Sequence, residues 1–265
     1  MSNDSLPEVD LSLLSGKLYP VVPKLLDVSN DYGAPNLLFL YDTPYIPDDK
    51  RQDLETIRYD IQSWNAWELA TAENQVQIQL SKKNLPDDDS IESRVKRSEY
   101  RAKVISVLRE EYENGWLLRA RSAIPKSFSK DIKKTSANAW VREVLQGHYI
   151  DTAVPKRAPV ILSIISNILA SNPYYGHKYY ISSVYYNYDN DLKIIRPYIE
   201  VSSFTVTQSP KEGAEDMIIL NAESLDFAFT LDKQGWEDAR SKVEDIVKEG
   251  EKIRQEMALD LYHAE

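Results

Sequence analysis

The fold is decided by residues 178–207, which read KYYISSVYYNYDNDLKIIRPYIEVSSFTVT. Tyrosine and β-branched residues dominate both halves of this stretch, and the run Asp189-Asn190-Asp191 separates them. Tyrosine, isoleucine, valine and threonine favour strands, whereas aspartate and asparagine favour tight turns. We therefore predict a β-hairpin with strands over residues 178–188 and 192–207.

The chain downstream continues this β pattern and then changes period. Residues 217–220 and 225–231 are predicted to form two further strands, separated by residues 221–224, so that the hairpin grows into an antiparallel meander. From about Gly235 to Tyr262 the apolar residues recur at helical spacing. This spacing predicts an amphipathic C-terminal helix.

Upstream, two apolar stripes predict a long αα-hairpin. The first helix spans about residues 50–83, with Asp48 or Asp49 as its N-cap, and a turn around Pro86 ends it. The second helix begins with a capping box from Asp89 to Glu92 and ends at residues 114–115. Its basic side chains are expected on a solvated face. They are Arg94, Lys96, Arg97, Arg101, Lys103 and Arg109.

The remaining segments are shorter or less regular. Six prolines make residues 1–50 irregular, apart from a short strand over residues 37–41. Residues 119–134 are interpreted as a basic loop, residues 137–146 as a short helix, and residues 159–170 as a buried core helix.

These elements together predict an α+β fold: an irregular N-terminal segment, a long αα-hairpin, an antiparallel meander and an amphipathic C-terminal helix. They divide the chain into residues 1–50, a mainly helical region over residues 51–172 with a basic second half, and residues 173–265 with the sheet and last helix. The three regions could equally form one integrated domain.

Composition excludes several classes of function. The chain has 265 residues, no cysteine and only 8 glycines, and it contains no phosphate-binding glycine motif and no serine-triad motif. The 3 histidines are far apart and lack metal-ligand spacing. The N-terminal residues do not resemble a signal peptide, and no apolar run reaches the roughly 20 residues of a membrane span. We expect a cytoplasmic protein without membrane contact, catalytic residues, metal or cofactor.

Charge is distributed in three blocks along the chain. Residues 93–211 hold 19 Lys/Arg against 10 Asp/Glu, whereas residues 1–92 and 212–265 are both acidic and bring the net charge to −10. The basic middle can pair with the acidic ends inside the fold, or it can present a surface to a polyanion.

A tyrosine-rich cluster lies within the basic block. Of 17 tyrosines, 8 fall between residues 174 and 198, with lysine and arginine interleaved. Aromatic rings beside cations suit unpaired bases, although tyrosine also packs within sheets. The candidate nucleic-acid-binding residues are Lys130, Lys133, Lys134, Arg142, Lys156, Arg157, Tyr174, Tyr175, Lys178, Tyr179, Tyr185 and Arg196.

In overall character these residues, with the acidic block over residues 212–265, resemble phage-encoded single-stranded DNA-binding proteins. The resemblance implies a non-enzymatic viral protein of the host cytoplasm that acts in DNA replication or recombination, forms oligomers and recruits protein partners through residues 212–265. The chain departs from that group in its few glycines, its long αα-hairpin and the helical pattern of its acidic end.

Two alternatives remain open at this level. A structural, assembly or adaptor protein would use the predicted helices for oligomerisation. A metal-dependent nuclease would need converging carboxylates, for which Asp189, Asp191 and Glu200 are the candidates. The simpler interpretation of Asp189 and Asp191 is that they form the hairpin turn.

Overall fold

The fold was analysed in a computed structural model. The structure describes residues 6–10, 31–32, 36–43, 46–110, 116–136, 139 and 177–262. The predicted helices over residues 137–146 and 159–170 lie outside this part, apart from Ala139.

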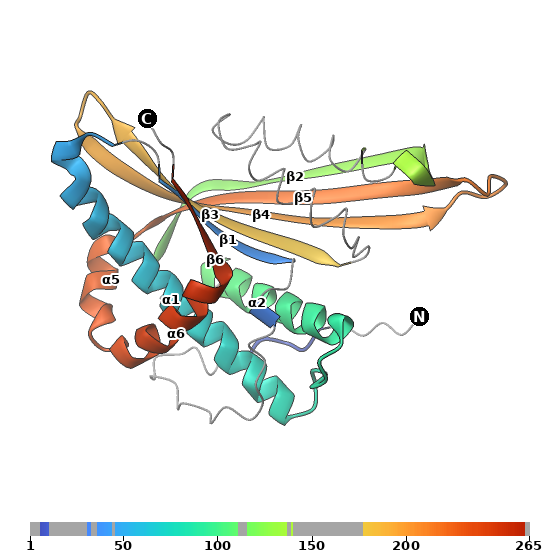
Figure 1. The fold of residues 1–265 in the computed structure, drawn as a ribbon, viewed down its shortest axis with the longest axis horizontal. Helices are drawn as coiled ribbons and strands as arrows, with labels where there is room; N and C mark the ends of the chain where they lie inside the picture. Colours follow the sequence, from blue (N-terminus) through green and yellow to red (C-terminus); the bar gives the residue numbers. More distant parts are fainter. Residues whose placement is uncertain are drawn as a thin grey trace. The chain divides into compact units, whose positions relative to one another are not determined.

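The described chain combines helices with a mixed sheet, so the predicted α+β class is confirmed (Figure 1). The helices are α1 (Arg51–Ser81), α2 (Ile91–Glu110), α5 (Lys233–Arg240) and α6 (Glu244–Met257), with the 3-10 turns η3 (Asp48–Lys50) and η4 (Lys134–Ser136). The strands are β1 (Leu37–Thr43), β2 (Leu117–Lys133), β3 (Lys178–Asp189), β4 (Ile194–Pro210), β5 (Met217–Leu231) and β6 (Ala258–Tyr262).

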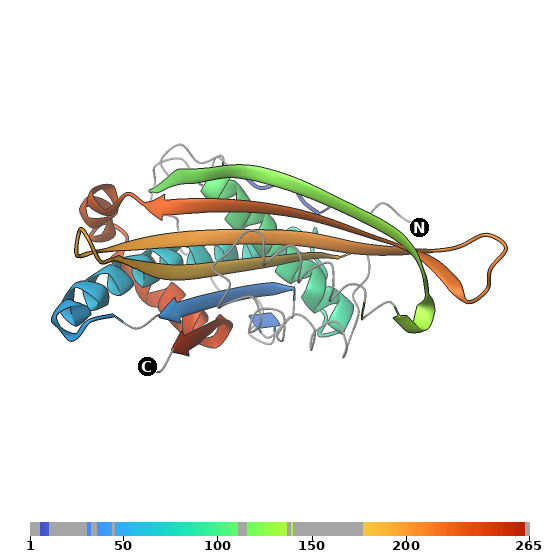
Figure 2. The same ribbon diagram turned by 90° about the horizontal axis from the view of Figure 1, so that it is seen from above.

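The strands form one sheet in the order β2-β5-β4-β3-β1-β6. β3, β4 and β5 are consecutive neighbours joined by short turns, which confirms the predicted meander. Strands β2 and β5 run antiparallel, since the main-chain amide of Lys134 donates to Asp216 while that of Asp232 donates to Trp116. β1 instead pairs in parallel with both β3 and β6, as Figure 2 shows for β1 and β6.

Residue contacts divide the chain into two compact units. Unit 1 comprises residues 1–122, 180–201 and 227–265, and unit 2 comprises residues 123–179 and 202–226. The boundaries therefore fall inside β2, β3, β4 and β5. The division into three regions that the sequence suggested stays a prediction.

Helix α1 is the central helix of unit 1, in contact with α2, α5 and α6. Its pairing with α2 is antiparallel, because Glu68 bonds Arg109 while Glu73, further along α1, bonds the earlier Arg101. This confirms the predicted αα-hairpin. The indoles of Trp67, Trp116 and Trp236 form an edge-to-face cluster, and Trp236 is fully buried.

Sheet pairing overrides two of the sequence predictions. Residues 119–134, predicted as a loop, belong mostly to strand β2, whose ladder to β5 satisfies main-chain groups that a loop would leave to water. Pro125 is tolerated there because β2 lies at one end of the described sheet. The two strands predicted over residues 217–231 are one strand, β5, in which Asn221 is held by a hydrogen bond from the Ser129 hydroxyl.

The predicted C-terminal helix is correct in type but wrong in extent. The helix is interrupted after Arg240, where the main-chain amide of Val243 donates to Arg240 in a turn. It ends at Met257, and residues 258–262 then pair with β1 as strand β6. Residues 258–262 form a strand in spite of their helical spacing, because they pair in parallel with β1, which is far away in the sequence.

Both predicted N-caps also differ from the structure. Asp48 and Asp49 lie in the turn η3, and no side chain caps α1. At α2 the cap is Ser90, whose hydroxyl accepts from the amide of Ser93 at 3.2 Å, and Asp88 accepts from the Ser90 amide and the Ser93 hydroxyl. Ser90 replaces the predicted box because its short hydroxyl already satisfies the main-chain amide of Ser93 in the first turn of α2.

Candidate functional site

Three of the predicted lysines form an exposed basic end to strand β2 in unit 2. Lys130 and Lys133 lie on β2, Lys134 opens η4, and all three side chains are exposed. Within the described residues, no carboxylate lies within ion-pair distance of any of them. We call these three residues the lysine cluster.

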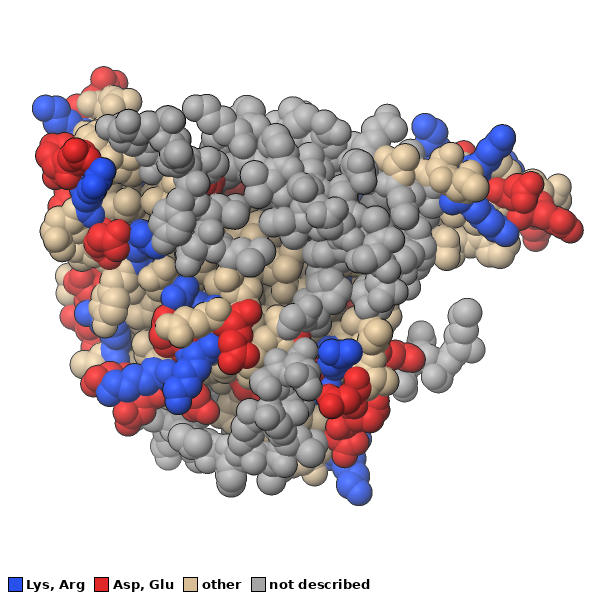
Figure 3. Space-filling view, in the orientation of Figure 1, with Lys and Arg blue, Asp and Glu red and all other residues tan. Residues whose placement is uncertain are grey.

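The surroundings of the lysine cluster are polar and contain both signs of charge. The neighbouring cation Lys211 forms an ion pair with Asp131 on β2. The turn between β4 and β5 is acidic, with Glu212, Glu215 and Asp216. Figure 3 likewise shows Lys and Arg interspersed with Asp and Glu over the described residues of the face drawn there. The positive charge at the end of β2 is therefore bordered by acidic side chains.

The remaining predicted site residues are placed differently. Tyr179 is buried, Tyr185 is half-buried against the ring of Tyr198 at 5.1 Å, and Arg196 forms an ion pair with Asp189 at 3.5 Å. Lys178 is exposed at the start of β3. Five others lie outside the described residues: Arg142, Lys156, Arg157, Tyr174 and Tyr175. Of the placed residues, Lys178 and Tyr179 belong to unit 2, and Tyr185 and Arg196 to unit 1.

Packing accounts for several tyrosines of the cluster. Tyr179, Tyr180 and Tyr186 are at most 2% exposed, so no base can reach their rings. Burial raises the pKa of Tyr180 far above its ordinary value, and the charge of Arg109 only partly opposes this. Among the described residues of this cluster, only half-buried rings such as Tyr185 and Tyr198 are therefore left as candidates for stacking on a base.

Helix α2 holds the most important departure from the sequence analysis. Arg97, Arg101 and Arg109 were expected on a solvated face, yet each is at most 5% exposed. Arg97 and Arg101 share the carboxylate of Asp31, and Arg101 also bonds Glu73 at 2.9 Å. The partners lie 28 to 70 residues away in sequence, so local periodicity carried no signal for them.

The third arginine forms a separate buried network. Arg109 donates two hydrogen bonds to Glu68, at 2.5 and 2.6 Å, and a third to the Ser182 hydroxyl. Asn65 donates to Glu68 and accepts from the Tyr41 hydroxyl. Burial disfavours the charged arginine, but the charge of Glu68, its hydrogen bonds and the neighbouring Tyr180 and Tyr41 together outweigh it, so the pKa of Arg109 is raised. The hydrogen bonds of Arg109 tie α1 and α2 to β3.

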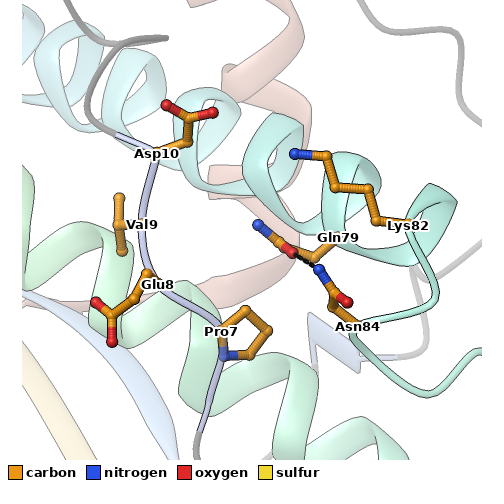
Figure 4. Close-up of a pocket in the computed structure, with 7 residues that line it drawn as sticks. All are labelled: Pro7, Glu8, Val9, Asp10, Gln79, Lys82 and Asn84. Atoms are coloured by element: carbon orange, nitrogen blue, oxygen red, sulfur yellow. Dashed lines mark hydrogen bonds between the residues drawn. The ribbon is translucent and has the colours of Figure 1, made fainter.

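A polar pocket of about 540 Å³ lies where residues 7–10 pass the end of α1 (Figure 4). Two of its side-chain amides are bonded to each other, because Asn84 donates to Gln79 at 2.8 Å. Tyr100 fixes the segment by donating to the Glu8 carbonyl at 3.3 Å, and burial raises the pKa of Tyr100 to about 12. The pocket therefore offers Lys82 and the exposed carboxylate of Glu8 at an open surface.

Carboxylates do not assemble into a metal site within the described residues, where no group of three or more His, Cys, Asp or Glu side chains could hold an ion. Asp189 accepts from the amides of Asp191 and Leu192, so its role is the predicted hairpin turn. Over the same part of the chain, no helix combines the length and the apolar character that a membrane span requires.

Comparison with known proteins gives little. No protein-family model matches the chain, and no curated protein matches it. Among solved structures, the Evf virulence factor matches with 11% sequence identity and a TM-score of 0.35, over 91% of this chain and 89% of that one.

Proposed function

We propose that the chain is a non-enzymatic protein that binds single-stranded nucleic acid in DNA replication or recombination, and that the lysine cluster provides its phosphate contacts. One observation carries the proposal: Lys130, Lys133 and Lys134 are each exposed near the end of β2 without a described carboxylate partner, unlike the buried arginines of α2. Unpaired cations on a surface bind polyanions by releasing the counterions of the phosphates.

The chemistry requires no catalytic group. The ammonium groups at the end of β2 contact phosphates of the bound strand, while the half-buried ring of Phe128, on the same strand of the protein, is available to one base. A base stacked on an aromatic ring contributes about 1–3 kcal/mol. The acidic residues of the neighbouring turn restrict the contact to the cluster itself.

The test is the affinity for a labelled oligothymidine of about 20 nucleotides, measured by fluorescence anisotropy at several salt concentrations. Replacing Lys130, Lys133 and Lys134 together by glutamine should weaken binding on the order of 100-fold at about 0.1 M salt. It should also reduce the slope of log K against log salt by about 2.

A matched control replaces three exposed lysines of the acidic C-terminal region by glutamine: Lys242, Lys248 and Lys252. Both variants lose the same net charge, so only the position of the lysines differs. The control should bind like the unaltered chain. Absence of binding by the unaltered chain at low salt would exclude the proposed function, and equal losses in both variants would exclude the lysine cluster.

The alternative of helix-mediated assembly lacks such an observation. The apolar side of α5 and α6 packs inside unit 1, where Trp236 donates to the Ser63 hydroxyl and Gly250 lies directly against the main chain of Ala66. Among the described residues, the large apolar side chains that are exposed are Leu118, Leu192 and Ile194 from strands or turns, with Tyr59 on α1 and Ile91 on α2. We therefore propose nucleic-acid binding alone.

A further inference from the structure

Two arginines one turn apart on α2 converge on a single carboxylate. Arg97 donates from Nε and Nη2 to the two oxygens of Asp31, each at 2.7 Å, and Arg101 donates from Nη1 at 2.9 Å. Asp31 is fully buried, and both arginines are at most 2% exposed. Fork-shaped donation of this kind is how guanidinium groups recognise carboxylate and phosphate ligands.

Both guanidinium groups are also positioned by groups other than Asp31. Arg97 uses its remaining donor, Nη1, for the carbonyl oxygens of Pro86 and Asp88, each at 2.8 Å. Arg101 is held on its other side by Glu73, and its guanidinium lies 5.4 Å from the ring centre of Tyr32. The donors that face Asp31 are therefore arranged by α1, α2 and the turn between them, as in a preformed receptor.

Asp31 differs from these supporting groups because it belongs to a remote part of the chain. It lies 66 residues before Arg97 and 70 before Arg101, whereas Glu73 belongs to the helix that packs on α2. Its carboxylate contacts the two arginines as a bound anion would, with each oxygen accepting from a guanidinium nitrogen. The contact also holds the neighbouring ring of Tyr32 against Arg101.

We propose that Arg97 and Arg101 form an oxyanion-binding site which the chain occupies with its own Asp31, so that residues 31–32 are held to α2 as an internal ligand. A small carboxylate or a phosphate oxyanion binds the same donors when the carboxylate of Asp31 is removed. The site lies in unit 1 and shares no residue with the lysine cluster, so it stands independently of the proposed function.

The experiment is chemical rescue of Asp31→Ala in the full chain. This substitution removes the carboxylate and leaves a methyl group, which opens a space of the size of formate. The midpoint of thermal unfolding is measured in sodium formate, sodium phosphate and sodium chloride at equal ionic strength. Asp31→Ala should melt below the unaltered chain in chloride, and formate should restore a large part of the loss in a saturable manner.

Phosphate distinguishes the two oxyanion classes. Recovery in formate alone assigns a carboxylate site, and recovery in phosphate as well assigns a general oxyanion site. If Asp31→Ala is unfolded in chloride, folding induced by either anion, followed by circular dichroism, supports the proposal in the same way. Equal behaviour of the variant in all three salts would overturn it and leave Asp31 as a structural ion-pair partner.

Two controls separate specific rescue from a general salt effect. Asp189→Ala removes a carboxylate that forms a partly exposed ion pair with Arg196, and formate should not restore its melting midpoint beyond chloride. Combining Asp31→Ala with Arg97→Lys keeps the charge but removes the fork of Nε and Nη2 donors, and this should abolish the recovery. Undiminished rescue in the combined variant would also overturn the proposal.

Discussion

The arginines of α2 and the lysines at the end of β2 come from the same basic block of sequence, yet the fold treats them in opposite ways. Arg97, Arg101 and Arg109 are buried and paired with carboxylates, whereas Lys130 and Lys133 are exposed. Guanidinium groups are suited to buried pairs, because their planar forks satisfy several acceptors at once and they are weakly hydrated. The flexible, strongly hydrated ammonium group of lysine stays in water. The surplus charge of the block therefore overstates the charge at the surface, because part of it is buried in arginine–carboxylate pairs.

The largest effect is expected when a buried pair is broken. Replacing Arg109 by methionine leaves the carboxylate of Glu68 without its charged partner in the interior. We expect a loss of about 3–5 kcal/mol in the free energy of unfolding, measured by urea denaturation. A double variant that also replaces Glu68 by glutamine should recover part of the loss. A loss below about 1 kcal/mol would show that the pair is not sealed from water.

The next effect concerns the packing of α6 against α1, the helix that carries Glu68 and Glu73. A Cβ at Gly250 would lie 1.7 Å from the main-chain oxygen of Ala66, so Gly250→Ala forces α6 away from α1. We expect a loss of about 1–3 kcal/mol or more in unfolding free energy. The control is Gly213→Ala, where φ is +75° but no atom lies within 4 Å of a Cβ, and the loss should be about 1 kcal/mol. Equal losses would contradict the close helix contact.

A smaller, pH-dependent effect is expected at the start of α2. Hydrogen bonds from Ser90 and Ser93 hold the pKa of Asp88 below its ordinary value of about 3.9. A carboxylate with a lowered pKa in the folded state stabilises the fold above about pH 4, and its contribution is lost as the pH falls further. The melting midpoints of the unaltered chain and Asp88→Ala should therefore converge between about pH 5 and pH 2. A constant difference would contradict the lowered pKa.

The smallest effect on stability is expected at the lysine cluster. Glutamine at Lys130, Lys133 or Lys134 should change the unfolding free energy by no more than about 0.5 kcal/mol each, since the side chains are exposed and lack described partners. The same variants are expected to lose nucleic-acid affinity, so these substitutions should lower the affinity without lowering the unfolding free energy. A substantial loss of stability would show that these lysines resemble the arginines of α2 after all.

The local sequence pattern predicted secondary structure correctly in segments whose structure does not depend on contacts with distant parts of the chain. The tyrosine-rich hairpin, the turn at Asp189 and the long first helix all follow from residue type and period. Strand β2 was missed because its basic residues and Pro125 are typical of loops as well as of strands at the end of a sheet. The candidate site shows the same limit: the sequence located the surplus cations, and only contacts across the fold separated the exposed lysines from the buried arginines.

Residue order alone established the α+β class, the helical hairpin and the meander, because each depends on periodicities that a short segment carries within itself. Tertiary structure decided the parallel pairing of β6 with β1 and the capture of Asp31 by Arg97 and Arg101. These features join residues far apart in the chain, and their free energy comes from burial and pairing that exist only once the chain has folded. These features therefore cannot be predicted from the local sequence.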